Sequence, residues 1–130
     1  MYTSNRTTYP STDLILIVAS DLDLGFILAL TLREELSHEV LLVADGNEAI
    51  DLCHLITPQL VLLDEQLPEM HALTVYKRLC QSAANRQIPG LLLGTSHPQD
   101  DSDLQRLYWI KKPFHWDKLL RTVKALLDAS

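Results

Sequence analysis

The feature that most constrains the fold is an apolar run that ends on a carboxylate, since four consecutive apolar residues, 60–63, lead directly into Asp64. An apolar run without polar alternation indicates a strand buried on both faces, as in a parallel sheet. An unpaired buried carboxylate is costly, so we expect Asp64 at the rim of that sheet. In open parallel sheets ligands bind at the carboxyl ends of the strands. The sequence therefore predicts a functional site around Asp64.

Similar apolar runs alternate with amphipathic segments along the chain. This alternation predicts an α/β domain, a parallel sheet covered by helices on both faces and joined by right-handed crossovers. The domain spans residues 14–128 and follows a polar, flexible N-terminal arm, residues 1–13. We expect strands over residues 14–18, 40–43, 59–64, 88–93 and 107–110, helices over residues 21–36, 48–55, 72–83 and 115–127, and only a short helix over residues 103–107.

Composition excludes several classes of partner. The net charge of -6, from 11 basic and 17 acidic side chains, disfavours direct binding to nucleic acid. No apolar stretch reaches membrane-spanning length, and residues 1–13 lack the apolar core of a secretory signal. Cys53 and Cys80 lack metal-ligand spacing, so we expect free thiols in a reducing cytosol. We therefore expect a cytoplasmic protein without a membrane partner.

Four strand ends carry residues with chemical potential. They are Ala19-Ser20, Asp64, Thr95 and Lys112, and a parallel sheet brings such ends to one rim. A carboxylate nucleophile, a hydroxyl and an ammonium group form a set suited to phosphoryl transfer. That reaction needs positioning and charge neutralisation, commonly with Mg²⁺.

The order and spacing of these motifs resemble the receiver domains of two-component response regulators, over about residues 14–128. The resemblance implies a flavodoxin-like, doubly wound five-stranded parallel sheet with strand order 2-1-3-4-5, a (βα)5 fold whose fourth helix is shortened here. The motifs that carry it are Leu60-Val61-Leu62-Leu63-Asp64 with Leu67-Pro68-Glu69-Met70, Asp45-Gly46-Asn47-Glu48-Ala49, Gly94-Thr95-Ser96 and Lys112-Pro113-Phe114.

The resemblance also implies roles for single residues. Asp64 is expected to be the phosphoacceptor, and Lys112, which precedes a cis peptide bond to Pro113, is expected to contact the phosphoryl group or Asp64. Thr95 is the hydroxyl that follows the phosphoryl group, and Trp109 takes the place of the aromatic switch residue. For Thr95 and Trp109, ordinary strand-end and packing roles remain open alternatives.

The first helix is apolar on more than one side. We expect its inward face to comprise Leu24, Ile27, Leu28, Thr31 and Leu32. Phe26, Ala29 and Leu30 are expected on the outer side, covered either by the N-terminal arm or by a partner. In the family this helix receives the phosphodonor, a histidine kinase or phosphotransfer protein, so these three residues are our candidate partner-binding residues.

The main departure from the family pattern concerns the metal. Ala19 and Ser20 stand where the family has two acidic residues that hold Mg²⁺. Mg²⁺ prefers oxygen ligands including carboxylates, and only Asp64 and the backbone carbonyl of Gln66 remain as family-type ligands. We therefore expect Mg²⁺ binding to be weak or absent, with Lys112 paired to Asp64, and we expect Asp21 to cap the following helix.

A second departure lies in residues 69–72, where the family has glycines and an aspartate. Losing the glycines removes easy access to left-handed backbone angles, so we expect a different path for this loop. His71 is either an exposed turn residue or a pH-sensitive neighbour of the site. The segment between Thr95 and Lys112 is shorter than is usual, which leaves open whether the family's common homodimer surface is kept.

Two hypotheses follow. In the first, the chain is a receiver of a two-component phosphorelay, a signalling module rather than an enzyme, that is phosphorylated on Asp64 and then switches its contacts with partners. In the second, it is a pseudo-receiver, a protein-interaction module that works without phosphorylation. A flavin-binding protein of the same topology lacks support, because no Gly-rich phosphate loop follows the first strand. No effector domain is expected after the last helix.

Overall fold

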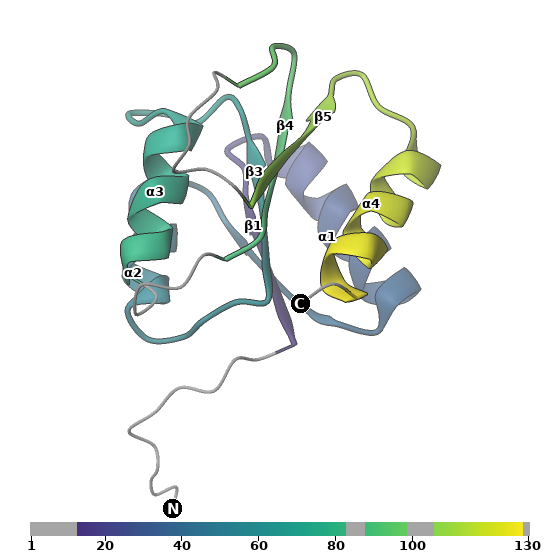
Figure 1. Ribbon diagram of the computed structural model, residues 1–130, viewed down its shortest axis with the longest axis horizontal. Helices are drawn as coiled ribbons and strands as arrows, with labels where there is room; N and C mark the ends of the chain where they lie inside the picture. The colour runs from purple at the N-terminus through teal and green to yellow at the C-terminus, as the bar shows by residue number, and fades with distance from the viewer. Residues whose placement is uncertain (1–12, 83–87, 99–105, 129–130) are drawn as a thin grey trace, which may run out of the picture.

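The protein is an α/β sandwich built on one parallel sheet, as a computed structural model that describes residues 13–82, 88–98 and 106–128 shows. The sheet has five strands in the order β2-β1-β3-β4-β5, which confirms the predicted flavodoxin-like topology (Figure 1). Every neighbouring pair is parallel, so all five strands deliver their carboxyl ends to the same rim. The strands are β1 (Leu14–Val18), β2 (Glu39–Val43), β3 (Leu60–Asp64), β4 (Gly90–Gly94) and β5 (Leu107–Lys111).

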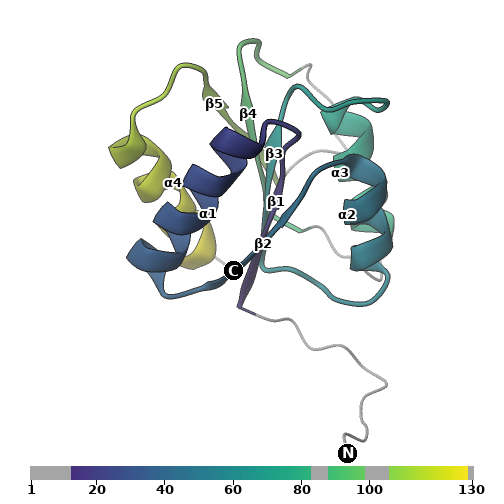
Figure 2. The ribbon, with the colours of Figure 1, turned by 180° about the vertical axis from the view of Figure 1, so that it is seen from behind.

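Two pairs of helices cover the two faces of the sheet. Helices α1 (Leu22–Leu36) and α4 (Trp116–Asp128) lie on one face, and α2 (Gly46–Cys53) and α3 (Ala72–Ser82) lie on the other (Figures 1 and 2). Side chains alternate along each strand, so Ile15 packs in the core cluster with α1 and α4 while Leu16 packs in the cluster with α2 and α3. Strands β3 and β4 are buried at every position, because both of their faces are covered.

Helix α1 packs Leu28 and Leu32 against the sheet as its sequence pattern predicts, but part of its buried face differs from the prediction. Ile27, expected to point inward, is 51% exposed, whereas Ala29, expected on the outer side, is 8% exposed and belongs to the core. Gly25 is buried as well, and a Cβ there would lie 2.8 Å from Leu42 Cδ1. The small residues Gly25 and Ala29 therefore lie where the helix packs closely against the sheet. The large residues that this leaves on the surface are Leu22, Phe26, Ile27 and Leu30, with 51–58% exposure.

Helix α2 begins at Gly46 rather than at residue 48 and ends at Cys53 rather than at residue 55. Its start resembles a capping box shifted by one residue: the N-cap Asp45 Oδ1 accepts a hydrogen bond from Glu48 N (2.8 Å), and Glu48 Oε1 accepts one from Ala44 N (3.1 Å), which precedes the N-cap. This reciprocal pair satisfies backbone N–H groups at the helix start. Asp45 is therefore the N-cap, and Gly46 and Asn47 belong to the first turn of the helix instead of preceding it.

The remaining boundaries match the prediction, as in β1, or differ from it by one or two residues, and parts of some predictions lie outside the described residues. Strand β4 starts at Gly90, not residue 88, because Pro89 has no N–H to donate, although its carbonyl accepts from Val61 N at 3.0 Å. Of the short helix expected over residues 103–107, residues 103–105 fall outside the described ranges, Arg106 is a turn residue and Leu107 opens β5. All of the expected N-terminal arm except Asp13 also falls outside them.

Both cysteines are free thiols, as expected, with Cys53 buried and Cys80 half-buried. Burial, helped by the nearby Cys80, raises the pKa of the Cys53 thiol to about 11, which keeps it protonated and unreactive at neutral pH. Across the helices that the structure describes, none combines the length and apolarity needed to cross a bilayer.

Candidate functional site

The centre of the site is Asp64, the last residue of β3, which is only 3% exposed. Its buried position follows from the register of the sheet, because Asp64 lies opposite Leu93 of β4 rather than beyond the sheet edge. Asp64 Oδ1 accepts a long hydrogen bond from Gln66 N (3.4 Å). A carboxylate buried to this degree needs a stronger partner than one backbone amide.

Lys112 supplies that partner from the end of β5. Its Nζ lies 2.5 Å from Asp64 Oδ1, and the lysine side chain is 24% exposed. The backbone holds it in place, since Lys112 N donates to Gly94 O at 2.8 Å. The peptide bond between Lys112 and Pro113 is cis, which confirms the expectation from the Lys-Pro-Phe motif. The expected pairing of Lys112 with Asp64 is also confirmed.

The end of β1 carries a methyl group and a hydroxyl in place of carboxylates. Ala19 is fully buried, and its N–H donates to Val43 O at 3.0 Å. Ser20 Oγ donates to the backbone carbonyl of Gln66 at 3.0 Å. The one backbone carbonyl that the sequence indicated as a metal ligand therefore already accepts a hydrogen bond within the chain.

Asp21 is the nearest acid after β1, and its side chain caps α1, as expected. Its Oδ1 accepts hydrogen bonds from Asp23 N (3.0 Å) and Leu24 N (3.2 Å). Asp21 also lines, with Thr95 and Lys112, an open cleft of about 430 Å³ whose remaining lining residues are Leu24, Pro113, Phe114 and Trp116. The cleft gives a small group access to Lys112.

Thr95 follows β4 and is exposed, but its polar groups turn toward a residue that the sequence analysis did not single out. Thr95 N donates to Glu65 Oε1 at 2.6 Å, and the Thr95 hydroxyl lies 3.5 Å from Glu65 Oε2. Ser96 N also points to Glu65 Oε1, at 3.5 Å. An acid directly after the strand-end aspartate, next to a Gly-Thr-Ser strand end, was the available signal, but its partners depend on the register between β3 and β4.

Trp109 lies in β5 opposite Leu92 and is half-buried. Its ring makes an edge-on contact with His97, with 4.7 Å between the ring centroids. Its indole Nε1 is buried and has no hydrogen-bond partner within residues 13–82, 88–98 and 106–128. The packing role expected as one alternative is present, and a switch role stays a prediction.

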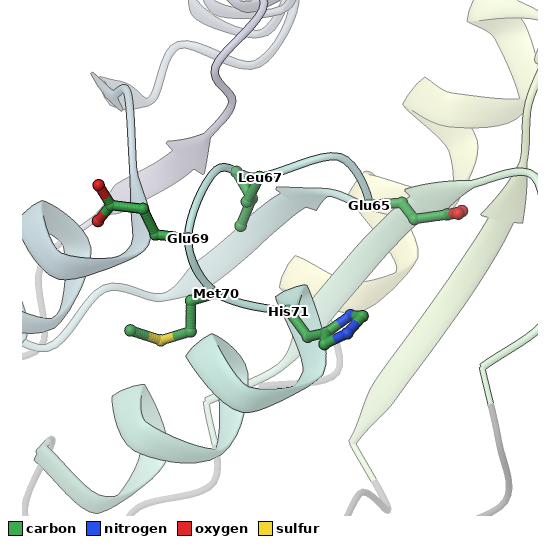
Figure 3. Close-up of a pocket in the computed structure, with 5 residues that line it drawn as sticks. All are labelled: Glu65, Leu67, Glu69, Met70 and His71. Atoms are coloured by element: carbon green, nitrogen blue, oxygen red, sulfur yellow. The ribbon is translucent and has the colours of Figure 1, made fainter.

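The loop after β3 lines a second pocket of about 320 Å³ with Glu65, Leu67, Glu69, Met70 and His71 (Figure 3). Glu69 takes a left-handed backbone angle, φ 69°, although it is not glycine. Such a conformation costs a non-glycine residue about 1 kcal/mol or more. His71 is exposed, as a turn residue is expected to be. The carboxylates of Glu65 and Glu69 point away from each other at opposite ends of the loop (Figure 3).

Neither pocket presents a metal centre of the usual kind. Among the residues with described positions, no group of three or more His, Cys, Asp or Glu side chains comes close enough together to hold a metal ion. Of the family-type ligands, the Asp64 carboxylate is paired with Lys112 and the Gln66 carbonyl with Ser20. Mg²⁺ usually binds proteins through one or two carboxylates and keeps several waters, and here the family-type carboxylate is already paired with a lysine, so the donor set fits Mg²⁺ poorly.

Comparison with known proteins identifies clear relatives, although no protein-family model matches the chain. The polar-differentiation response regulator DivK of Brucella anthropi is 30% identical over 115 residues, a match that covers 85% of this chain and 94% of DivK. The chemotaxis protein CheY4 of Vibrio cholerae has a similar structure, with a TM-score of 0.77 at 22% identity, over 89% of this chain and 99% of that one.

A third similar structure is the receiver domain of a sensor histidine kinase from Pseudomonas aeruginosa, with a magnesium ion coordinated in its active-site cleft. Its TM-score is 0.75 at 24% identity, over 91% of this chain and 99% of that one. At these identities the two solved structures show the fold alone.

Replacing Lys112→Met tests the ion pair at the centre of the site. We expect the free energy of unfolding to fall by about 3 kcal/mol, because the variant leaves the Asp64 carboxylate buried without its counter-charge. Urea unfolding followed by circular dichroism measures the change. The double variant with Asp64→Asn should recover most of the loss, and Lys111→Met, at the exposed neighbouring lysine, is the control. Equal losses at Lys111 and Lys112 would contradict a stabilising role for the pair.

Proposed function

Because the chain belongs to the receiver domains of two-component response regulators, we propose that it accepts a phosphoryl group on Asp64. The donor in this proposal is a histidine kinase or a phosphotransfer protein of the cytoplasm. The observation that carries the proposal is the contact between Lys112 Nζ and Asp64 Oδ1, 2.5 Å long, at the carboxyl edge of the sheet. It places a nucleophile next to a cation, and the cation lines an open cleft.

In the proposed reaction a carboxylate oxygen of Asp64 attacks the phosphorus atom of the donor. The new O–P bond forms as the bond from phosphorus to the donor breaks, and the donor keeps that electron pair. The Lys112 ammonium then moves from the carboxylate to the phosphoryl oxygens, where it offsets their negative charge. The cleft of about 430 Å³, lined by Thr95 and Lys112, provides room for the incoming group.

Thr95 and Trp109 are the residues that we propose to signal the change. The phosphoryl group adds charge and strong hydrogen-bond acceptors next to β4 and β5. Thr95 is exposed, and its hydroxyl, which lies 3.5 Å from Glu65 Oε2 in the unphosphorylated chain, can rotate toward such an acceptor. Trp109 packs against His97, which follows Thr95 by two positions, so a movement of this segment changes the surroundings of the indole ring.

We propose that Mg²⁺ binds this site weakly or not at all, unlike the metal site of the Pseudomonas structure. The support is the state of the donors, since the Gln66 carbonyl already accepts a hydrogen bond from Ser20 and Ala19 has no side-chain oxygen. The positive charge that the phosphoryl group needs comes from Lys112 instead, so the proposed reaction does not depend on a metal.

Restoring the acidic pair should create the missing metal site. In the variant Ala19→Asp/Ser20→Asp we expect Mg²⁺ affinity to rise at least about tenfold over the native chain, because two carboxylates are added and the Gln66 carbonyl is released. Tryptophan fluorescence or NMR titration with MgCl₂ measures the affinity. Ser37→Asp, after the far end of α1, controls for added charge. A native chain that saturates at low millimolar Mg²⁺ would contradict weak binding.

Incubation with acetyl phosphate, with and without Mg²⁺, tests phosphorylation itself. We expect one added phosphoryl group on the native chain by intact mass and none on Asp64→Asn, because the amide is not a nucleophile for this step. Asp51→Asn, at an exposed aspartate on α2, is the matched control and should be labelled like the native chain. Absence of an adduct on a folded native chain would exclude the phosphoacceptor function.

That negative result would favour the second candidate, a pseudo-receiver that binds partners without phosphorylation. A specific observation supports this alternative. The methyl group of Ala19 and the hydrogen bond from Ser20 Oγ to Gln66 O (3.0 Å) replace the metal ligands with groups satisfied inside the chain. In this alternative the chain keeps the receiver fold but is not phosphorylated on Asp64.

Partner binding is proposed on the outer face of α1, but the exposed residues differ from the predicted set: one predicted residue is buried and two others are exposed. Phe26 and Leu30 are 58% and 54% exposed, while Ala29 is buried and does not contribute surface. Leu22 and Ile27 join them instead, so four large apolar side chains share one helix surface. An exposed apolar patch of this kind is typical of an interaction site. It follows directly after Asp21, which lines the cleft, so a donor on this face lies close to the site.

The double variant Phe26→Ser/Leu30→Ser separates docking from chemistry. We expect phosphoryl transfer from a phosphorylated histidine phosphotransfer domain to slow by at least about tenfold, because the partner loses buried apolar contacts. Labelling by acetyl phosphate, which needs no docking, should be unchanged. Leu55→Ser, at an exposed leucine beyond α2, is the control. A loss of both activities would point to a folding defect instead.

A further inference from the structure

Three hydrogen-bond donors at the end of β4 converge on one carboxylate. Thr95 N lies 2.6 Å from Glu65 Oε1, Ser96 N lies 3.5 Å from the same oxygen, and the Thr95 hydroxyl lies 3.5 Å from Oε2. Two successive backbone amides and a hydroxyl form a small anion-binding nest. In this structure the anion in the nest is the side chain of Glu65.

The backbone around Glu65 is arranged so that this contact forms. Glu65 N donates to Leu93 O at 2.8 Å, which continues the pairing of β3 with β4 by one residue. The side chain then crosses over Gly94, and a Cβ at residue 94 would overlap the Glu65 carboxylate. Gly94 is buried, so no other position for a side chain is open there. The glycine of the Gly-Thr-Ser motif therefore makes room for Glu65.

We propose that Glu65 is a positioning residue that competes with the phosphoryl group on Asp64 for the donors of Thr95 and Ser96. This inference rests on the proposed function and adds an intramolecular competitor to it. Thr95 has one hydroxyl proton, so it cannot donate to Glu65 and to a phosphoryl oxygen at once. In the unphosphorylated chain, the Glu65 carboxylate therefore takes the place at the Thr95 and Ser96 donors that a phosphoryl group would take.

Electrostatics gives the competition its direction. Glu65 holds Thr95, and Thr95 lines the same cleft as Lys112, the partner of Asp64. A phosphoryl group that enters this cleft on Asp64 therefore adds negative charge on the side of Thr95 where the Glu65 carboxylate is bound. Like charges repel strongly at the short distances and reduced dielectric of a protein surface. Phosphorylation therefore displaces Glu65 from the nest, and the work of displacing it lowers the fraction of chains that carry the phosphoryl group.

The variant Glu65→Gln tests the inference by removing the charge while keeping the shape. In the unphosphorylated protein we expect the Thr95 amide proton to move upfield in ¹H–¹⁵N spectra, because it loses its charged acceptor. At a fixed acetyl phosphate concentration we expect the ratio of phosphorylated to unphosphorylated chain to rise about tenfold by intact mass. Glu69→Gln, which removes a carboxylate from the same loop, should leave both measurements as in the native chain.

The outcomes separate this inference from the function on which it rests. An adduct on the native chain that is equal to or larger than that on Glu65→Gln overturns the competitor role and leaves the phosphoacceptor function standing. No adduct on either chain, with both folded, overturns both. An equal rise in Glu69→Gln also overturns the competitor role, because loss of loop charge alone then explains it. Glu65→Ala is a second variant, in which the ratio of phosphorylated to unphosphorylated chain should also be higher than in the native chain.

Discussion

The site depends on the burial of a single carboxylate. Asp64 is 3% exposed at the end of β3, and a charge in that position is stable only with a close partner. Lys112 provides it at 2.5 Å, and Lys112 is itself held to β4 through its N–H and Gly94 O. One ion pair thus joins the ends of strands β3 and β5 across β4. The contact that stabilises the buried carboxylate is also the contact on which the proposed phosphorylation of Asp64 depends.

Other polar groups near Asp64 are also satisfied within the chain. Ser20 occupies the Gln66 carbonyl, and Glu65 occupies the Thr95 amide. In the proposed mechanism, the Ser20 hydroxyl takes the place of a metal ion at the Gln66 carbonyl. The Glu65 carboxylate takes the place of the phosphoryl oxygens at the Thr95 amide. Activation in the proposed mechanism is therefore an exchange of partners, in which Lys112 and Thr95 leave internal carboxylates for an incoming group. The energies exchanged are those of charge-assisted hydrogen bonds, about 1.5–3 kcal/mol each.

Sequence patterns predicted the fold better than they predicted surfaces. The alternation of apolar strands with helices was sufficient for a parallel sheet covered on both faces, and the resemblance to receiver domains implied its strand order. Helix α1 is apolar on several sides, so periodicity alone identified only part of its buried face. The close contact of Gly25 with Leu42 of β2 decided it and turned Ile27 outward and Ala29 inward. At α2 the apolar pattern predicted a helix start at residue 48, whereas the contact between Asp45 Oδ1 and Glu48 N caps a helix that starts at Gly46.

The sequence by itself determined the strands and the residues at their ends, including Asp64, Thr95 and Lys112, because apolar runs and the residues that follow them are local features. The strand order followed from the resemblance of its motifs to receiver domains. Only the tertiary structure decided which donor meets which acceptor. Lys112 and Asp64 are 48 residues apart, and Thr95 and Glu65 are 30 apart, so both contacts depend on strand register. A register shift of one residue turns a side chain to the other face of the sheet. That is why Glu65 could be recognised as a partner of Thr95 only in the folded chain.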